Sequence, residues 1–489
     1  MASVVVFASS GAVLVLETLA GRLVAPYVGV TLETFTAIIG VVLAGISLGT
    51  WVGGRAADRY GPERLLGPLL AVGGALVVAS LPVVRVLGPG IRNGSTESLV
   101  ILTVLAFFAP SAVLSAVSPV AVRTQLHDLA VTGTVVGRLS AIGTAGSLAG
   151  VFATGFVLVT TMPVPAIVVG SGIALVIGGV AMAIWLRRAE RGPLGGAVGL
   201  AIVAVGLQVG LPPECDVQTA YYCASVEVDE EREGGRVLRL DTLRHSYVDL
   251  DDPTHLEFRY IRWFGSAIDA LLPGDEPVDA VHLGGGGFTM PRWLEETRPG
   301  STSVVLELDE QLVELVEDEL GLETSDDLQA ITGDARVSIA GLDDDSADLA
   351  IGDAFGGIAV PWHLTTRELV EEVHRVLRDD GVYIANIIDH PPLRFLRAEM
   401  ATFDAVFEHV AVIGDAELRD GTGGGNSVLV ASDRPLDALD ELPIPTGAAE
   451  LPAGTGALVD DEARAWMGEP EVLTDDFAPV DQWLTQRTG

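Results

Sequence analysis

The sequence contains no lysine, so arginine supplies all 29 of its basic side chains, against 66 aspartates and glutamates. A protein that binds nucleic acid needs a basic patch, and none is visible along this chain. Composition therefore argues against nucleic acid as a partner. An acidic, lysine-free surface suggests a high-salt cytoplasm or medium, where dissolved ions screen the repulsion between carboxylates.

Cysteine is scarce as well, because the chain has only Cys215 and Cys223. Two cysteines at this spacing make neither a CxxC redox motif nor a four-cysteine metal site. They pair as a disulfide if they face an oxidising compartment, and two free thiols are the alternative. We therefore expect no metal in the functional site of this protein.

The 49% apolar content and the net charge of −37 belong to different parts of the chain. Residues 1–212 contain 11 arginines and 7 acids, whereas residues 213–489 contain 18 arginines and 59 acids. Seven apolar segments lie in the first part, most of them near the roughly 20 residues that cross a bilayer. They span 4–25, 35–54, 65–87, 99–122, 138–161, 164–186 and 194–211. Residues 1–212 are therefore predicted to be a polytopic α-helical membrane domain of about seven helices, in contact with lipid.

The arginines between these segments predict the orientation of the chain, because cytoplasmic loops are enriched in them. Eight arginines fall on one side of the predicted membrane: Arg55, Arg59, Arg64, Arg123, Arg138, Arg187, Arg188 and Arg191. Three fall on the other side: Arg22, Arg85 and Arg92. This bias puts the N-terminus inside, and seven crossings then put the acidic domain outside. The last segment is short and contains Gln208, and if it does not cross, the domain is cytoplasmic.

Glu17 and Arg22 are ionisable residues of the first apolar segment. Such residues usually face the interior of a helix bundle and often mark a pathway, and a polar contact between helices is the alternative. Their spacing of five puts them on different helical faces, so we do not expect them to pair. Glycines of the fifth segment predict close helix packing. These are Gly143, Gly146, Gly150 and Gly155.

A small β element and linker are predicted over residues 213–276. Two short strands, 221–228 and 236–240, flank a turn, and a helix begins near Leu256. The simplest interpretation is a small sheet that caps the next domain. Such a segment can also supply substrate residues to a nucleotide cleft, and the candidates are His245, Tyr260 and Arg262.

The stretch from Val278 to Asp309 indicates a nucleoside site. An apolar run ends at four glycines, 284–287, a helix-like segment follows, and a second apolar run ends at Glu307. Glycines let a backbone approach a ligand closely at a helix N-terminus. An acid about 20 residues later can accept hydrogen bonds from two ribose hydroxyls. A glycine-rich loop with no ligand is the alternative.

Strands and helices alternate over residues 277–435, which predicts a doubly wound, Rossmann-like α/β domain. Two late strands joined by a turn-rich loop suggest an antiparallel edge, as in S-adenosylmethionine-type folds. Ligands in such sheets lie beyond the carboxyl ends of the strands. Four residues follow predicted strands at that end: Gly284, Glu307, Asp334 and Asp353. Glu307 is assigned to ribose and Asp334 to an adenine amino group, whereas Asp353 acts as a general base or holds a cation.

Several stretches of the chain resemble the spermidine synthase family of aminopropyltransferases, and the membrane half makes the chain similar to fused transporter-like/spermidine synthase proteins. The matching stretches are LDTLRHSYVDLDDPTHLEF, HLGGGGFTMPRWL, LELD, TGDAR, GDAFGGIAVPWHLTT and LTDDFAPVDQW.

The resemblance implies a role for each matching site residue. The turn of Gly284, Gly285 and Gly286, together with Glu307, would hold decarboxylated S-adenosylmethionine, and Asp334 would contact adenine. Asp353 would take a proton from an amine nucleophile, which needs a free lone pair to attack. No metal is required, because the sulfonium is already a good leaving group.

The sequence also departs from the family pattern. Gly287 stands where soluble members have the aspartate of GGGD, and Gly356 replaces a second aspartate of their DSSD-like loop. Their YHE triplet is Tyr260, Ile261 and Arg262 here, and His245 aligns with a glutamine. The nucleoside side is kept, whereas charges that would hold a cationic diamine are missing.

The sequence therefore predicts a membrane-anchored enzyme that transfers an aminopropyl group to a small-molecule amine, with Asp353 as base and with Tyr260 and His245 near the amine. One alternative is a methyltransferase that uses S-adenosylmethionine itself. Another is a transporter or sensor whose domain only binds a nucleoside or polyamine. Residues 436–489 are predicted as an acidic, Pro- and Gly-rich C-terminal segment. The oligomeric state is left open, a homo-oligomer included.

Overall fold

The computed structural model of the chain describes residues 1–29, 32–91, 96–126, 132–186, 191–272, 274–356 and 359–484. The chain divides into two compact units, Met1–Ala224 and Ser225–Gly489. Residues 213–224 therefore group with the helical unit, and residues 436–484 with the α/β unit.

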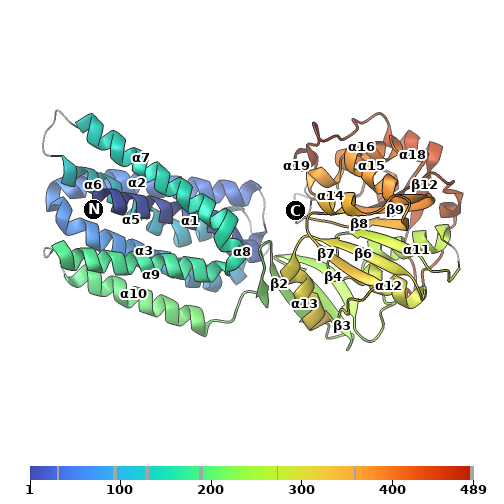
Figure 1. Ribbon diagram of the computed structural model, residues 1–489, viewed down its shortest axis with the longest axis horizontal. Helices are drawn as coiled ribbons and strands as arrows, with labels where there is room; N and C mark the ends of the chain where they lie inside the picture. Colours follow the sequence, from blue (N-terminus) through green and yellow to red (C-terminus); the bar gives the residue numbers. More distant parts are fainter. Residues whose placement is uncertain are drawn as a thin grey trace. The chain divides into compact units, whose positions relative to one another are not determined.

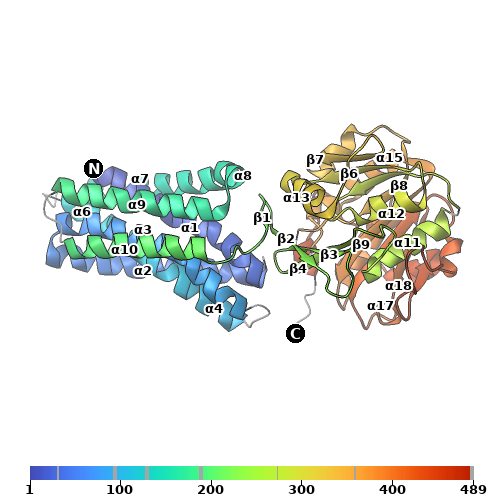
Figure 2. The same ribbon diagram turned by 90° about the horizontal axis from the view of Figure 1, so that it is seen from below.

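The first unit is a bundle of long helices that lie side by side (Figures 1 and 2). Seven helices among its described residues are long and apolar enough to cross a membrane, as the sequence predicts. They are α1 (Ala2–Val28), α2 (Leu32–Tyr60), α3 (Pro62–Leu87), the run of α4 (Thr96–Thr103), α5 (Ala109–Ser115) and α6 (Val117–Gln125), α7 (Thr132–Ala153) with α8 (Val159–Thr161), α9 (Val164–Leu186) and α10 (Arg191–Gly210). Of the arginines used to predict orientation, Arg92, Arg187 and Arg188 lie outside the described residues.

Glycines allow the backbones of α1 and α7 to touch. A β-carbon on Gly146 would lie 2.2 Å from the carbonyl oxygen of Phe7, and one on Gly150 would lie 2.6 Å from that of Gly11. Side chains at these positions would force the two helices apart, so the predicted packing role of Gly146 and Gly150 is present in the structure. Gly155 has open space where its β-carbon would be, so packing does not explain it.

Polar contacts tie the residues after α10 to the helices of the same unit. Arg85 forms an ion pair with Glu214 at 2.8 Å. The guanidinium of Arg22 donates to the backbone carbonyls of Thr219 and Ala220. Cys215 and Cys223 form a disulfide, which is one of the two alternatives that the sequence left open.

The second unit is built on an eight-stranded mixed sheet in the order β12-β10-β11-β9-β8-β5-β6-β7. Its strands are β5 (Asp279–Leu283), β6 (Thr302–Glu307), β7 (Leu328–Thr332), β8 (Ala347–Gly352), β9 (Leu377–Asp389), β10 (His409–Gly414), β11 (Gly425–Ser432) and β12 (Gly456–Val459). Strands β7, β6, β5, β8 and β9 pair in parallel, whereas β11, β10 and β12 add an antiparallel edge. This is the predicted α/β fold with the predicted edge hairpin.

Helices cover both faces of this sheet (Figure 1). One core packs the sheet against α15 (Arg367–Val376), α16 (Arg394–Asp404) and α18 (Asp460–Met467). The other core packs it against α11 (Arg259–Leu271) and α12 (Thr289–Thr297). Fully buried Trp263 of α11 and Trp293 of α12 belong to this second core, in which α11 packs on the sheet against β9 and β11.

Two strands of this unit were not predicted. The first is β4 (Leu243–Asp249), which pairs antiparallel with β3 (Gly235–Leu240). The second is β12, which follows a Pro- and Gly-rich stretch and pairs with β10. The β4 strand matters most for function, because it brings residues 243–247 to the glycine turn.

Candidate functional site

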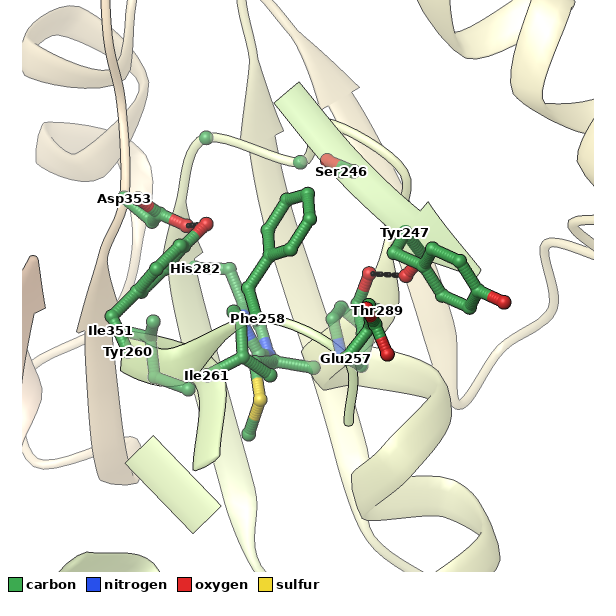
Figure 3. A pocket seen from close by; sticks show the side chains of 14 residues that line it. Ser246, Tyr247, Glu257, Phe258, Tyr260, Ile261, His282, Thr289, Ile351 and Asp353 are labelled. Carbon is green, nitrogen blue, oxygen red and sulfur yellow. Dashed lines mark hydrogen bonds between the residues drawn. The ribbon is translucent and has the colours of Figure 1, made fainter. Parts of the chain in front are cut away.

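Asp353 lies directly after β8 and is held by two neutral donors. The Tyr260 hydroxyl donates to its Oδ2 at 3.0 Å (Figure 3). The Asn386 amide donates to its Oδ1 at 2.9 Å. Asn386 is itself fixed, because its Oδ1 accepts from the amide of Asn426 at 3.0 Å. Burial raises the pKa of Asp353 to about 6, and the two hydrogen bonds oppose that rise. Asp353 is thus an oriented carboxylate that can accept a proton near neutral pH.

The glycine turn after β5 packs directly on the backbone of Asp353. Gly284 has a φ of +96°, and a β-carbon there would lie 2.6 Å from the carbonyl oxygen of Asp353. The Asp353 backbone N–H in turn donates to the carbonyl of Leu283 at 3.0 Å. The turn therefore needs glycine both for its conformation and for this close approach.

Glu307 ends β6 with a side chain that is only 8% exposed. Its Oε2 accepts from the N–H groups of Gly285 and Gly286 at 2.8 and 3.3 Å, and its Oε1 accepts from that of Asp309 at 3.1 Å. Burial raises the pKa of Glu307, and these three donors oppose the rise. The carboxylate is held beside the turn, where it can accept hydrogen bonds from ligand hydroxyls.

Two cavities meet at Asp353. The smaller, of about 30 Å³, lies between the glycine turn and α11–α12 and is the one in Figure 3. The larger, of about 530 Å³, lies between β4 and the ends of β8, β9 and β11. Glu257, Phe258, Tyr260 and Asp353 line both. The volume of the larger cavity, about 530 Å³, is typical of small-molecule sites.

His245 and Arg244 of β4 line the larger cavity. Burial lowers the pKa of His245 to about 4, so its imidazole is neutral at physiological pH and does not repel a cation. The Arg244 guanidinium lies 5.6 Å from the centre of the Phe258 ring. On the side of the larger cavity, Asp353 therefore shares its surroundings with a basic side chain, Arg244, and an apolar one, Phe258.

The structure brings most of the predicted site residues together. Gly284, Gly285 and Asp353 line the smaller cavity, His245 lines the larger, and Tyr260 lines both. Gly286 approaches His245, because its β-carbon would lie 3.1 Å from the imidazole Nδ1.

Four predicted site residues line neither cavity: Gly286, Glu307, Asp334 and Arg262. Asp334 caps α14 (Ala335–Ser338) by accepting from the backbone N–H of Arg336 at 2.9 Å, and its Oδ2 lies 3.2 Å from His363 Nε2. Arg262 Nε donates to the carbonyl of Leu256 at 2.7 Å. The described residues contain no group of three or more His, Cys, Asp or Glu side chains placed to hold a metal ion.

Sequence reasoning missed Asn386, Asn426, Glu257 and Ser246. Asn386 had a readable signal, because it is a lone amide within the apolar run VYIANII. Ser246 had none, because its role depends on the unpredicted β4. Its Oγ accepts from the N–H of Gly287 at 3.0 Å.

Comparisons with known proteins find similarity over part of the chain. No protein-family model matches the chain. The chain is 33% identical over 163 residues to the polyamine aminopropyltransferase of Vibrio vulnificus strain CMCP6. The matched stretch covers 33% of this chain and 52% of that protein. The chain is also 29% identical over 166 residues to the polyamine aminopropyltransferase of Chromobacterium violaceum, 33% of this chain and 62% of that protein. The chain thus spans only about half to three fifths of these relatives.

A solved structure is similar over a longer stretch. This is the probable spermidine synthase from Corynebacterium glutamicum ATCC 13032, with 28% sequence identity and a TM-score of 0.48. The match covers 55% of this chain and 99% of that one.

Proposed function

We propose that the α/β domain of this chain, which is similar in sequence to two polyamine aminopropyltransferases, transfers an aminopropyl group from decarboxylated S-adenosylmethionine to a small amine, with Asp353 as the general base. One observation supports this most strongly. A carboxylate with a pKa near 6, oriented by Tyr260 and Asn386, lies where a turn suited to a nucleoside meets a cavity sized for a second substrate.

The nucleoside would lie along the carboxyl ends of β5, β6 and β7. The turn of Gly284, Gly285 and Gly286 approaches its sulfonium end, and Glu307 accepts hydrogen bonds from the ribose hydroxyls. Asp334 directly follows β7. The N–H of the preceding residue, Gly333, donates to the carbonyl of Glu307 at 2.8 Å, which holds the end of β7 beside the end of β6. This position suits the adenine amino group.

The amine would enter the larger cavity as an ammonium ion. Asp353 takes one of its protons, which frees a lone pair on nitrogen. That lone pair attacks the aminopropyl carbon attached to sulfur, so a C–N bond forms while the C–S bond breaks. The sulfur leaves with the bonding electrons as the neutral thioether, 5′-methylthioadenosine. Tyr260 and His245 lie beside this path, and neither side chain adds positive charge.

The Asp353 assignment is tested with the full-length protein. Asp353→Asn keeps the size of the side chain but removes the base, so the rate of methylthioadenosine formation should fall by about 10²- to 10⁴-fold. Asp476→Asn is the matched control, because Asp476 is exposed in the same unit and outside both cavities. Equal rates for the two variants would refute Asp353 as the base.

One observation favours a second function, methyl transfer from S-adenosylmethionine. Gly287 offers no carboxylate for a cationic diamine, where the resemblance expects an aspartate. Titration of the full-length protein with both forms of the nucleoside separates the two functions. Tighter binding of the carboxylated form, together with methylated product, would establish methyl transfer instead.

We also propose that the helical unit spans a membrane, so that the protein is a multi-pass membrane protein. The support is the seven apolar helices, each of 18 residues or more. Carbonate extraction of membranes from expressing cells tests this. The full chain should stay in the pellet, and release into the supernatant would contradict the proposal.

A further inference from the structure

The helical unit contains a cleft that the proposed transferase does not use. It has a volume of about 310 Å³ and lies between α1, α2, α5, α6 and α7. Thr50, Ser140 and Thr144 on its rim are exposed, so the cleft is open. The volume equals that of roughly ten liquid water molecules at about 30 Å³ each.

Hydroxyl groups dominate the lining of this cleft, since seven of its 13 residues are serine or threonine. Among the described residues, two of these hydroxyls donate to protein groups, Thr50 to the carbonyl of Ile46 and Ser147 to that of Ser10. The other five make no hydrogen bond among the described residues. They are Ser10, Ser115, Ser118, Ser140 and Thr144.

Several hydroxyls elsewhere in the same unit bond to their own helix, although those of Ser111 and Thr154 have no partner among the described residues. Thr18 donates to Leu14, Ser80 to Val77 and Ser171 to Val168, each through a backbone carbonyl. This is the usual way in which serine and threonine are satisfied within apolar helices. The five hydroxyls of the cleft are therefore available to a partner from outside the chain, either water or a ligand.

Glu17 is the next ionisable residue along α1 from the residues that line the cleft, although it is not itself part of the lining. It follows Val13 and Leu14, which line the cleft, by four and three residues, so it occupies the same face of α1 one turn further along. No ion pair or hydrogen bond of Glu17 is present among the described residues. The nearby Arg22 donates instead to the backbone carbonyls of Thr219 and Ala220. A carboxylate within an apolar helix that faces a polar cleft is the arrangement expected of a cation site.

We propose that this cleft binds a small protonated amine. The ammonium group would donate to the cleft hydroxyls, and Glu17 would supply the opposite charge. An anion would be repelled by Glu17, and a neutral polyol would leave that carboxylate without a counter-charge in an apolar unit. The inference rests on the proposed membrane span, but it does not depend on the transferase activity.

A local chemical probe tests the site in the full-length protein. Both native cysteines are in a disulfide and no described cysteine is free, so Thr144→Cys introduces a single reactive thiol at the rim. The rate of its reaction with a methanethiosulfonate reagent is measured without reductant in lipid nanodiscs. Putrescine is the probe, and 1,4-butanediol, which has the same length and no charge, is its control.

Putrescine should slow the labelling of Thr144→Cys several-fold, and butanediol should not. Thr161→Cys is the matched control, because Thr161 is exposed on α8 and its hydroxyl bonds to its own helix. Labelling of this variant should be unaffected by putrescine.

Addition of Glu17→Gln should abolish the protection. If that variant does not fold, the double variant Ser115→Ala, Ser118→Ala should weaken it. Addition of Asp353→Asn should leave the protection intact, which separates this site from the α/β domain. Equal labelling with and without putrescine, equal protection by butanediol, or protection that persists in both cleft variants would overturn the proposal.

Discussion

The side-chain oxygen of Ser246 accepts a hydrogen bond from the backbone N–H of Gly287 at 3.0 Å, and any β-carbon at Gly287 would lie 2.9 Å from the β-carbon of Ser246. Strand β4 thus occupies the space that a side chain after the glycine turn would need. The departure from the GGGD pattern is therefore steric as well as electrostatic. It is coupled to a residue 41 positions earlier in the chain.

Restoring the family's aspartate at Gly287 should therefore damage the protein. Gly287→Asp should lower the free energy of unfolding by about 1–3 kcal/mol, the usual cost of overpacking. Combining it with Ser246→Gly removes the clashing atoms, so the double variant should regain part of the loss; Val248 still lies 3.1 Å from the added β-carbon. Chemical denaturation of the three variants measures this. If Gly287→Asp unfolds with the same free energy as the unmodified protein, β4 moves aside without cost and the steric explanation is wrong.

The pH dependence of kcat/KM should report Asp353. Because only its ionised form accepts a proton, activity should rise with pH through about 6, the pKa of that carboxyl. Tyr260→Phe removes a hydrogen bond that favours the ionised form, so the pKa should rise and the acid limb should move to higher pH. An acid limb that is absent, or that Tyr260→Phe leaves in place, would contradict the role of Asp353.

Glu307→Gln should weaken nucleoside binding with little effect on the amine. The variant loses a charged acceptor for the ribose hydroxyls, and a hydrogen bond to a charged group contributes about 1.5–3 kcal/mol. The Kd of 5′-methylthioadenosine should therefore rise by about 10- to 100-fold. Glu310→Gln, exposed on α13 (Glu310–Leu320), is the matched control. If calorimetry gives the same Kd of 5′-methylthioadenosine for Glu307→Gln and Glu310→Gln, Glu307 does not bind the nucleoside.

The disulfide makes the side of the membrane testable. An oxidising compartment favours the Cys215–Cys223 bond, and the arginine bias with seven crossings puts residues after α10 outside. An impermeant maleimide should label intact cells only after treatment with an impermeant reductant. The sulfonium donor would then be needed on that side. Labelling only after lysis would place these residues in the cytoplasm.

The main features of the fold followed from local patterns in the sequence. Apolar runs that stop at Gly284, Glu307 or Asp353 located the carboxyl ends of the parallel strands, because such runs are long enough to identify buried strands. The seven apolar helices were equally clear. Their length and composition identify them without any tertiary information.

The features that sequence reasoning missed depend on contacts between distant segments. Strand β4 has the mixed pattern LRHSYVD, and its role appears only when it packs beside Gly286 and Gly287. Strand β12 has four residues and depends on pairing with β10. Asn386 was within a predicted strand, but its contact with Asp353 depends on the alignment of β8 with β9. In each case the missed feature depends on tertiary packing, which the local sequence pattern does not contain.

Product analysis is the decisive test of whether this chain transfers an aminopropyl group. The purified full-length protein is incubated with decarboxylated S-adenosylmethionine and a panel of mono-, di- and polyamines, and products are quantified by mass spectrometry. We expect one methylthioadenosine for each aminopropylated amine, and no such product with Asp353→Asn. A folded protein that binds the nucleoside but forms no aminopropylated amine from any acceptor would contradict this expectation.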